Sequence, residues 1–462
     1  MPAPAVGASA MDNLHQIFKA YDIRGRVPEE LDEDVARSIG AAFADFTGAR
    51  RLAVGRDCRP SSPGLAGAFM EGATGRGTDV LDLGMVTTDT VYFVSGKEAV
   101  PGAVVTASHN PAGWNGIKLC KAGAAPVGMG SGLEEVEKLA AAPPQPLPPA
   151  QRGSVEARRV TEAYVDHLFG VVEAGHIGAL RVAADGGNGV AGLVLPPAFE
   201  RIDATLLGLY LAPDGRFPNH PADPLRPENL EDLLKLMEEE EPDLGVAFDG
   251  DADRAFFIDD QRRPLSGSTT TAIIARWFLQ REPGALVVHN LITSRAVPET
   301  IERYGGKPVR TRVGHSFIKA VMADTGAVFG GEHSGHYYFR ANYRADSGML
   351  ALLVLLQAIS EDGRPLSEMR KEFEYYAESG EINLEVPDQR GALQQVAAVF
   401  SGESLDWTDG LTVEWEDRWF NLRPSNTEPV LRLNAEAGDR AGVERLVERV
   451  TGILQEGGSG AS

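Results

Sequence analysis

The sequence predicts a fold of three α/β units followed by a smaller α+β domain, and three observations support this. A short apolar strand, a polar loop and a helical pattern follow one another three times, starting near Arg50, Leu180 and Gly284. From about residue 374 the pattern changes to alternating strands and one amphipathic helix. A chain of 462 residues also has the length of about three or four domains.

The composition is that of a globular protein with an acidic surface. Hydrophobic residues make up 43% of the chain and charged residues 24%, which argues against disorder, and the net charge is −22. This surface repels phosphate backbones and anionic lipids, so we expect neither nucleic acid nor a membrane as a partner, and nothing implies a protein partner. Cys58 and Cys120 cannot form a disulfide framework and fit a reducing compartment. Residues 1–16 lack the basic segment of a signal peptide, so we expect a cytoplasmic location.

The first unit, predicted to span residues 11–153, contains the stretch GAVVTASHNPAGWNGIKL at residues 102–119. GAVVTA has the composition of a buried strand, and the following Asn-Pro is typical of a turn, because proline disfavours helical backbone in the residue before it. Ser108 lies in this turn and is either a nucleophile or only a turn residue. The proline-rich residues 140–154 disfavour helix and sheet and mark the end of the unit.

The second unit, predicted to span residues 154–261, contains DLGVAFDGDADRAFFIDD, with three carboxylates between two apolar strands. Asp249, Asp251 and Asp253 repel one another unless a cation lies among them, and oxygen ligands favour Mg²⁺, Ca²⁺ or Mn²⁺ over zinc. An EF-hand loop is disfavoured because it needs a distal glutamate and flanking helices. A solvated acidic hairpin tip is the other alternative. Mg²⁺ keeps open positions for phosphate, so a phosphorylated Ser108 is a possible further ligand.

The third unit, predicted to span residues 262–373, contains the polar sequence GGEHSGHYYF. Glu332 and Ser334 supply an acceptor and a donor suited to sugar hydroxyls. His336 follows them, although a single histidine is more often structural than catalytic. The apolar run MLALLVLLQAI at residues 349–359 is too short to span a bilayer and predicts a buried helix.

The last domain, predicted to span residues 374–462, contains NLRPSNTEPVLRL. Arg423 offers a planar fork for phosphate, and Ser425, Asn426 and Thr427 add hydroxyl, amide and backbone donors. The alternative is a helix capping box between Ser425 and the glutamate three residues later. The following proline and the strand-like VLRL favour an anion-binding loop.

The motifs TASHNP, DGDADR, GEHSGH and RPSNTEP, in this order, resemble those of the α-D-phosphohexomutases. The resemblance is strongest to the bacterial phosphomannomutase/phosphoglucomutase branch, which FKAYDIRG at residues 18–25 also fits. It runs from Met11 to about Leu454. It implies three similar mixed-sheet α/β domains and a smaller C-terminal α+β domain around a central cleft, with one loop from each domain.

The resemblance also implies roles for individual residues. Ser108 would be a phosphoserine, and its phosphate would join Asp249, Asp251 and Asp253 in holding Mg²⁺. Lys118 or His315 would move the proton of the attacking hydroxyl, provided that a cation or burial lowers the pKa of the lysine. The other residues at matching positions are the catalytic Arg254 and the substrate-binding Tyr21, Arg24, Glu332, Ser334, His336, Arg423, Ser425, Asn426 and Thr427.

The implied reaction is a reversible shift of phosphate between O1 and O6 of hexose monophosphates, those of mannose and also of glucose. A hexose 1,6-bisphosphate would be the intermediate and the activator, and Mg²⁺ with cationic side chains would stabilise the charge on the transferring group. One segment departs from the family pattern. HNLITSR at residues 289–295 has no lysine where related mutases place one toward the cleft, which leaves open the cation that orients the substrate there.

Three alternatives stay open at this point. A phosphoglucosamine mutase would share the scaffold. A Mg²⁺-dependent sugar-phosphate phosphatase would use Ser108 but release inorganic phosphate. A non-catalytic sugar-phosphate sensor would have little need for the serine and the aspartates together.

Overall fold

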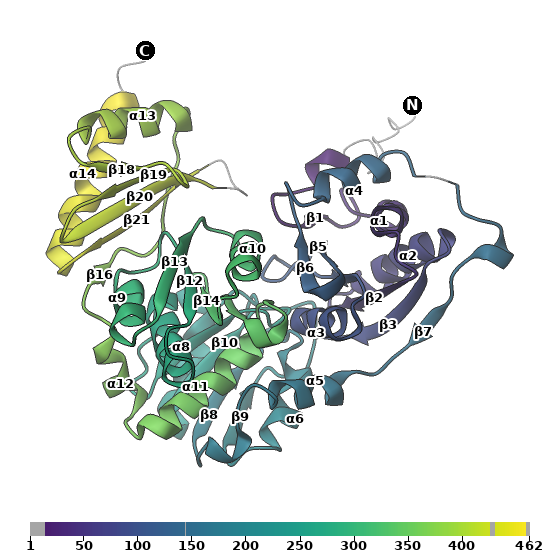
Figure 1. Ribbon diagram of the computed structural model, residues 1–462, viewed down its shortest axis with the longest axis horizontal. Coiled ribbons are helices and arrows are strands. Elements are labelled where there is room, and N and C mark those ends of the chain that lie inside the picture. Colours follow the sequence, from purple (N-terminus) through teal and green to yellow (C-terminus); the bar gives the residue numbers. More distant parts are fainter. Residues whose placement is uncertain (1–13, 144, 426–429, 459–462) are drawn as a thin grey trace, which may run out of the picture.

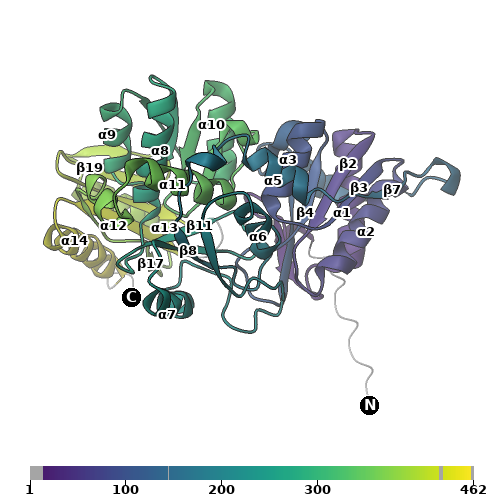
Figure 2. The same cartoon turned by 90° about the horizontal axis from the view of Figure 1, so that it is seen from below.

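The structure, a computed structural model, describes residues 14–143, 145–425 and 430–458, and its four β-sheets follow one another along the chain (Figure 1). In Figure 1 the first domain and the yellow C-terminal domain stand on opposite sides, with the second and third domains between them. In the view from below, the first domain again lies on one side, and the third and C-terminal domains overlap on the other (Figure 2).

The first domain holds a mixed seven-stranded sheet. Its strands are β1 (Ile23–Arg26), β2 (Arg51–Arg56), β3 (Asp79–Met85), β4 (Gly102–Val105), β5 (Trp114–Lys121), β6 (Ala125–Val127) and β7 (Val155–Ala157). Its helices are α1 (Glu33–Thr47), α2 (Ser62–Gly75), α3 (Thr88–Glu98) and α4 (Leu133–Ala140).

The second and third domains each hold a four-stranded sheet. The second domain consists of α5 (Thr161–Leu168), β8 (Arg181–Asp185), α6 (Leu195–Phe199), β9 (Thr205–Leu209), α7 (Glu231–Glu240), β10 (Leu244–Phe248) and β11 (Ala255–Asp259). The third consists of α8 (Gly267–Arg281), β12 (Leu286–Asn290), α9 (Ala296–Arg303), β13 (Lys307–Thr311), α10 (His315–Thr325), β14 (Phe329–Gly331), β15 (Tyr337–Phe339), α11 (Gly348–Asp362) and α12 (Leu366–Met369).

These three sheets share one arrangement, which confirms the prediction of three similar α/β domains. Three neighbouring strands are parallel in each sheet, in the orders β3-β2-β4, β9-β8-β10 and β13-β12-β14. A fourth strand, β5, β11 or β15, then pairs antiparallel with the last of them. The turn that precedes this fourth strand therefore occupies an equivalent place in each domain, and each of the first three polar motifs lies in such a turn.

The prolines of residues 140–154 mark an irregular segment, as expected. Between the end of α4 and the start of β7, the described residues contain only one short 3₁₀ turn, Pro149–Gln151. β7 pairs parallel with β3, so the first sheet extends to Ala157, slightly beyond the predicted limit at residue 153. The other domain limits stay predictions.

A shared hydrophobic core joins the first three domains. It includes Leu81 of β3, Phe248 of β10, Phe329 of β14 and most of α11. The predicted buried helix at residues 349–359 is confirmed, because every residue of this run in α11 is buried. In the described part of the chain, no helix combines the length and apolarity that a membrane span requires.

The C-terminal domain has a separate core and an antiparallel sheet. Its elements are β16 (Ala377–Glu378), β17 (Ile382–Leu384), α13 (Gln389–Val399), β18 (Ser404–Asp406), β19 (Leu411–Glu414), β20 (Arg418–Pro424), β21 (Leu431–Ala437) and α14 (Arg440–Gly458). The predicted strands and the final helix are confirmed. α13 and β18 were not predicted, although α13 shows two helix signals: Asp388 caps its N-terminus by accepting from Gly391 N, and Leu393 and Val396 are buried at helical spacing.

Candidate active site

A cleft of about 1000 Å³ lies where the four domains meet. Every domain contributes polar residues to its lining, among them Ser108, Lys118, Arg254, His315, Glu332 and Arg423. The four sequence motifs, which are far apart in the chain, thus converge on one cavity.

Ser108 lies directly after β4, and the turn brings it against the loop of the second domain. Ser108 is 3% exposed, and its backbone has a left-handed φ of 50°. The hydroxyl Oγ donates to Asp249 Oδ2 at 2.5 Å and accepts from Arg254 Nη2 at 3.3 Å. Ser108 is therefore both a turn residue and a hydroxyl in contact with the acidic loop.

The three aspartates of the second domain are buried at 0–1% exposure, so the alternative of a solvated hairpin tip is wrong. The flanking strands β10 and β11 also exclude an EF-hand. One ligand oxygen from each of Asp249, Asp251 and Asp253 lies within 4.8 Å of the others. Oδ1 of Asp251 and Oδ1 of Asp253 are buried without a hydrogen-bond partner in the described structure. Buried carboxylate oxygens of this kind fit a divalent cation.

Lys118 of β5 lies against the same loop. Its Nζ donates to Asp251 Oδ2 at 2.7 Å and to Asp253 Oδ2 at 2.5 Å. Burial lowers the pKa of Lys118, but the two carboxylates outweigh burial and hold this pKa well above its ordinary value. The condition for Lys118 as a base, a lowered pKa, is therefore not met in this arrangement.

Arg254 connects the aspartate loop with the serine loop. Its Nε donates to Asp249 Oδ2 at 2.9 Å, and its Nη2 donates to His109 Nδ1 at 2.5 Å. Burial and the positive charge of Arg254 hold the pKa of His109 well below its ordinary value. Burial raises the pKa of Asp249 to about 7, even though Arg254 opposes this.

The loop between β14 and β15 places Glu332, Ser334 and His336 on the cleft. Glu332 is 2% exposed, and its carboxylate accepts from Gly314 N at 3.1 Å and from Tyr338 OH at 2.8 Å. These contacts hold its oxygens at the wall of the cleft.

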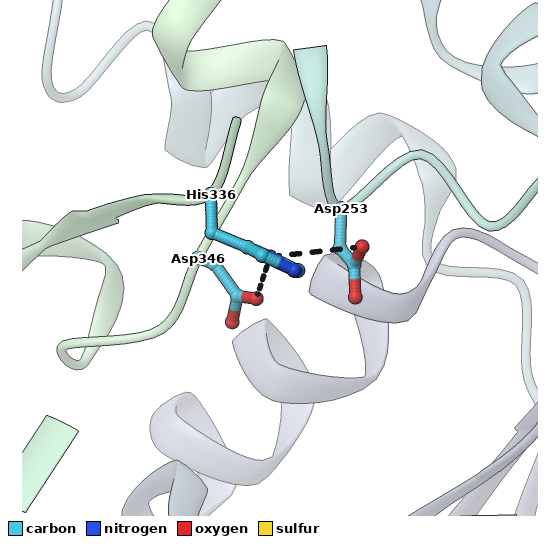
Figure 3. Close-up of side chains that lie close together, drawn as sticks. All are labelled: Asp253, His336 and Asp346. Atoms are coloured by element: carbon cyan, nitrogen blue, oxygen red, sulfur yellow. Dashed lines mark hydrogen bonds and ion pairs between the residues drawn. The ribbon is translucent and has the colours of Figure 1, made fainter. Parts of the chain in front are cut away.

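His336 lies between two carboxylates (Figure 3). Its Nδ1 is 2.9 Å from Asp346 Oδ2 and 3.9 Å from Asp253 Oδ1. Burial lowers the pKa of His336, but Asp253 and Asp346 outweigh burial and raise it. Asp346 comes from the segment before α11 and was not predicted.

His315 is the first residue of α10 and lines the cleft beside Tyr21, with ring centroids 5.2 Å apart. Burial and the nearby charge of Lys319 hold the pKa of His315 well below its ordinary value, so the imidazole is neutral at pH 7. Tyr21 OH donates to Val313 O at 3.1 Å, and burial raises its pKa to about 12.

Arg24 lines the cleft next to the serine loop. It donates from Nε to Asp22 Oδ2 at 2.9 Å and from Nη1 to Asn110 Oδ1 at 2.5 Å. Lys19, from the same segment, also lines the cleft and was not predicted.

Arg423 is the cleft residue of the C-terminal domain that the sequence predicted. It is 3% exposed, donates from Nη2 to Glu381 Oε2 at 2.9 Å, and has a buried Nε without a partner among the described residues. Ser425 lies beyond the described lining of the cleft, and Asn426 and Thr427 lie outside the described residues. Arg432 and Glu381 line the cleft and were missed, although Glu381 directly precedes β17.

The segment HNLITSR contributes Ile292, not a cation, to the cleft lining. Arg295 at its end points to the C-terminal domain, where it donates from Nη1 to Glu416 O at 2.6 Å. The unpredicted cations Lys19 and Arg432 provide positive charge in the cleft instead.

Comparison with known proteins agrees with this geometry. The models of the phosphoglucomutase/phosphomannomutase alpha/beta/alpha domains I, II and III match residues 15–142, 162–262 and 266–376, and that of the C-terminal domain matches residues 381–453. The chain belongs to the phosphoglucomutase/phosphomannomutase family. It is therefore an enzyme of the mutase type.

Similar proteins are known over nearly the full length. A phosphomannomutase of Salmonella montevideo is 38% identical over 455 residues, which cover 96% of this chain and 99% of that protein. A phosphohexose mutase of Xanthomonas campestris is 39% identical over 444 residues, covering 95% and 99%. The crystal structure of a family protein from Burkholderia thailandensis is 33% identical with a TM-score of 0.87, covering 96% and 98%.

Proposed function

We propose that the chain interconverts the 1-phosphates and 6-phosphates of hexoses, acting on mannose phosphates and also on glucose phosphates, with Ser108 as the phosphate carrier. One observation carries this proposal. The Ser108 hydroxyl lies 2.5 Å from an aspartate of the acidic loop, on a cleft that all four domains line. The names of the relatives, phosphomannomutase and phosphohexose mutase, support the substrate class.

Asp249, Asp251 and Asp253 would hold Mg²⁺ together with a phosphate oxygen on Ser108. Their two unpartnered oxygens and the absence of nitrogen or sulfur ligands in this triad support a hard cation. When bound, Mg²⁺ supplies positive charge to the transferring phosphoryl group. Arg254, which contacts both Ser108 and Asp249, adds positive charge from the protein.

Each transfer is balanced without a further reactant. The bond between Ser108 Oγ and phosphorus breaks as phosphorus bonds to a sugar hydroxyl oxygen. The proton of this hydroxyl passes to a base on the cleft, and Ser108 Oγ takes up one proton and is left as a free hydroxyl. The resulting hexose 1,6-bisphosphate then turns round, and its other phosphoryl group returns to Ser108 in the reverse of the same step. Enzyme whose Ser108 carries no phosphate therefore needs the bisphosphate as an activator.

His315 is the group we assign to accept the sugar proton, because its low pKa keeps it neutral at pH 7 and it lines the cleft. Lys118, which two carboxylates keep charged, would stabilise negative charge instead.

Substrate binding is divided among three domains. Glu332, Ser334 and His336 would bind sugar hydroxyls, and Arg423 with Ser425, Asn426 and Thr427 would bind the phosphate that is not transferred. Tyr21 and Arg24 complete the lining on the side of the first domain. Because a single anion loop serves both orientations, it would bind the 6-phosphate in one half of the cycle and the 1-phosphate in the other.

Coupled assays with mannose 1-phosphate, glucose 1-phosphate and glucosamine 1-phosphate test this function. We expect conversion of the mannose and glucose compounds to their 6-phosphates in the presence of Mg²⁺ and a trace of glucose 1,6-bisphosphate. Continuous release of inorganic phosphate would support a phosphatase instead. Glucosamine 1-phosphate as the best substrate would contradict the proposed substrate class.

A further inference from the structure

Arg59 is a fully buried arginine that lies under the serine loop and does not touch the cleft. It follows β2, and its residue is 1% exposed. A guanidinium has five N–H donors in a rigid plane, and burying it is unfavourable unless these donors find acceptors. The partners of Arg59 therefore indicate why it is there.

Every N–H of the guanidinium has an acceptor. Nε donates to Asp57 Oδ2 at 3.0 Å. The other four bonds go to backbone carbonyl oxygens of the serine loop: Nη2 donates to Ser108 at 2.8 Å and Asn110 at 2.6 Å, and Nη1 donates to Pro111 at 2.7 Å and Trp114 at 3.0 Å. One side chain thus holds most of the turn between β4 and β5.

The turn needs such support because Ser108 has a φ of 50°, in the left-handed region that non-glycine residues seldom adopt. The bond from Arg59 to the Ser108 carbonyl fixes the orientation of this peptide. It thereby fixes the direction of the Ser108 side chain, whose hydroxyl reaches Asp249 at 2.5 Å.

Asp57 anchors the arginine to the rigid part of the first domain. Its backbone N–H donates to Val105 O at 2.9 Å, at the end of β4. Its Oδ1 accepts from Ser62 Oγ at 2.5 Å, at the start of α2. The guanidinium is therefore held by the sheet and a helix, and it holds the loop in turn.

The second domain covers the guanidinium from the other side. The Phe217 ring centroid lies 5.1 Å from Arg59 Cζ, a cation–π contact. Gly215 approaches so closely that a Cβ atom there would lie 2.3 Å from Arg59 Cα. The arginine is thus enclosed between two domains.

We propose that Arg59 is a positioning residue for phosphoryl transfer: its four bonds to loop carbonyls, with Phe217 holding the guanidinium in place, aim Ser108 Oγ at the reacting phosphate. Arg59 acts only through Ser108 and does not contact the substrate. It sets the rate at which Ser108 accepts and donates phosphate, and it leaves the binding of the sugar phosphate unchanged. This inference rests on the proposed function, because its readout is the phosphorylation of Ser108.

The test compares Arg59→Lys with Arg370→Lys in the full-length protein. Lysine keeps the charge but has no planar fork and cannot bond four carbonyls at once. Arg370 is a matched control, because it is also a buried arginine, at 9% exposure, but does not contact the serine loop. It donates to Asp259 Oδ2 at 2.8 Å and to Pro264 O at 3.0 Å. Dephosphorylated protein is mixed with glucose 1,6-bisphosphate, and phosphate on Ser108 is followed by quenched-flow mass spectrometry. kcat and KM for glucose 1-phosphate are measured beside it.

We expect Arg59→Lys to slow the phosphorylation of Ser108 and to lower kcat by roughly 30- to 100-fold, with KM changed by less than about twofold. Arg370→Lys should keep kcat within about threefold of wild type, even if its melting temperature falls as far as that of Arg59→Lys. Equal losses in the two variants, or a kcat of Arg59→Lys within about threefold of wild type, would overturn the proposal.

Three further outcomes are decisive. If circular dichroism shows that Arg59→Lys does not fold, Phe217→Ala replaces it, since this variant keeps every hydrogen-bond donor. A fall in its phosphorylation rate of about threefold or more, at unchanged KM, supports the proposal, and an unchanged rate overturns it.

If wild type takes up phosphate on Ser108 but does not isomerise hexose phosphates, the proposed function fails and the Arg59 comparison still stands. If wild type takes up no phosphate there, both fail.

Discussion

Lys118 donates to the Oδ2 atoms of two carboxylates of the acidic loop, at 2.7 and 2.5 Å, so its ammonium group offsets charge on the same carboxylates whose unpartnered Oδ1 atoms would hold a divalent cation. Thr88 Oγ1 donates to Asp251 Oδ2 at 2.7 Å and adds a neutral contact. At the scale of single residues, the affinity for Mg²⁺ therefore depends on how much negative charge remains beside Lys118.

Asp251→Asn tests this charge balance. The substitution removes one negative ligand, so we expect the Mg²⁺ concentration for half-maximal activity to rise at least about tenfold. Because Asp251 is 0% exposed and paired with Lys118, the variant should also lose about 1–3 kcal/mol of stability.

A Mg²⁺ titration of activity provides the measurement, with Asp259→Asn as the control. Asp259 is equally buried on β11 but pairs with Arg370. An unchanged Mg²⁺ dependence in Asp251→Asn, or the same shift in both variants, would refute the metal assignment.

Residues that share a short motif were predictable, and residues that meet only in the fold were not. Ser108, Asp249 and Glu332 each lie in a contiguous polar sequence next to a strand, which marks them in the chain. Asp346 and Arg59 contact motif residues from outside the motifs, Asp346 from 10 residues after His336 and Arg59 from 49 residues before Ser108, so only the folded contacts reveal them.

At the scale of elements, the start of α3 links three domains through one buried carboxylate. Asp89, in its first turn, accepts from Ser347 Oγ at 2.6 Å and from the hydroxyls of Thr87 and Tyr164. Ser347 in turn caps α11 by accepting from Leu350 N at 3.1 Å. Burial raises the pKa of Asp89 to about 6.

Asp89→Asn should change how stability depends on pH. The folded pKa of about 6 lies above the unfolded value of about 3.9, so the folded state retains a proton that the unfolded state has lost. In the wild type, the contribution of the Asp89 carboxyl to the free energy of unfolding is fully present below pH 4. It falls by about 1–3 kcal/mol as the pH rises through 6.

Melting temperatures of both proteins between pH 4 and 7 provide the check. Because asparagine does not titrate, the melting temperature of Asp89→Asn minus that of wild type should become more positive as the pH rises. A difference that stays constant across this range would contradict the role of Asp89.

Element boundaries were predicted best where apolar patterns were long. α11, with a long apolar run, was predicted correctly, and so were the strands on both sides of the aspartate motif. The short strands β14 and β15 around Glu332 were not predicted. α13 was missed because only Leu393 and Val396 of it are buried and its sequence lies between strand-like segments.

At the scale of the whole molecule, the first three domains share one core and the C-terminal domain has its own. Arg295 connects the two parts. Besides its bond to Glu416 O at 2.6 Å, it donates to the carbonyl oxygens of Trp415 and Arg418. Since Arg423 comes from the C-terminal domain, the position of this domain should affect phosphate binding.

Arg295→Ala should loosen this junction. We expect KM for glucose 1-phosphate to rise about tenfold while kcat changes by less than about threefold, because phosphate binding suffers and Ser108 does not. Faster proteolysis between the third and C-terminal domains should accompany the change. A KM within about twofold of wild type would contradict the role of Arg295.

The convergence of four distant motifs on one cleft could not be read from strand and helix patterns alone. The repeated strand–loop–helix pattern predicted three units, but only the shared topology explains why their loops occupy equivalent places. The family resemblance led us to expect a central cleft, and the structure shows which residues line it.

The phosphorylation state of Ser108 tests the central claim most directly. Intact mass spectrometry of the isolated protein should show one added phosphate that Ser108→Ala lacks. Protein that has been fully dephosphorylated should be nearly inactive on hexose monophosphates until hexose 1,6-bisphosphate is added, because a free serine has no phosphoryl group to donate. Full activity of dephosphorylated protein without any bisphosphate would contradict the account.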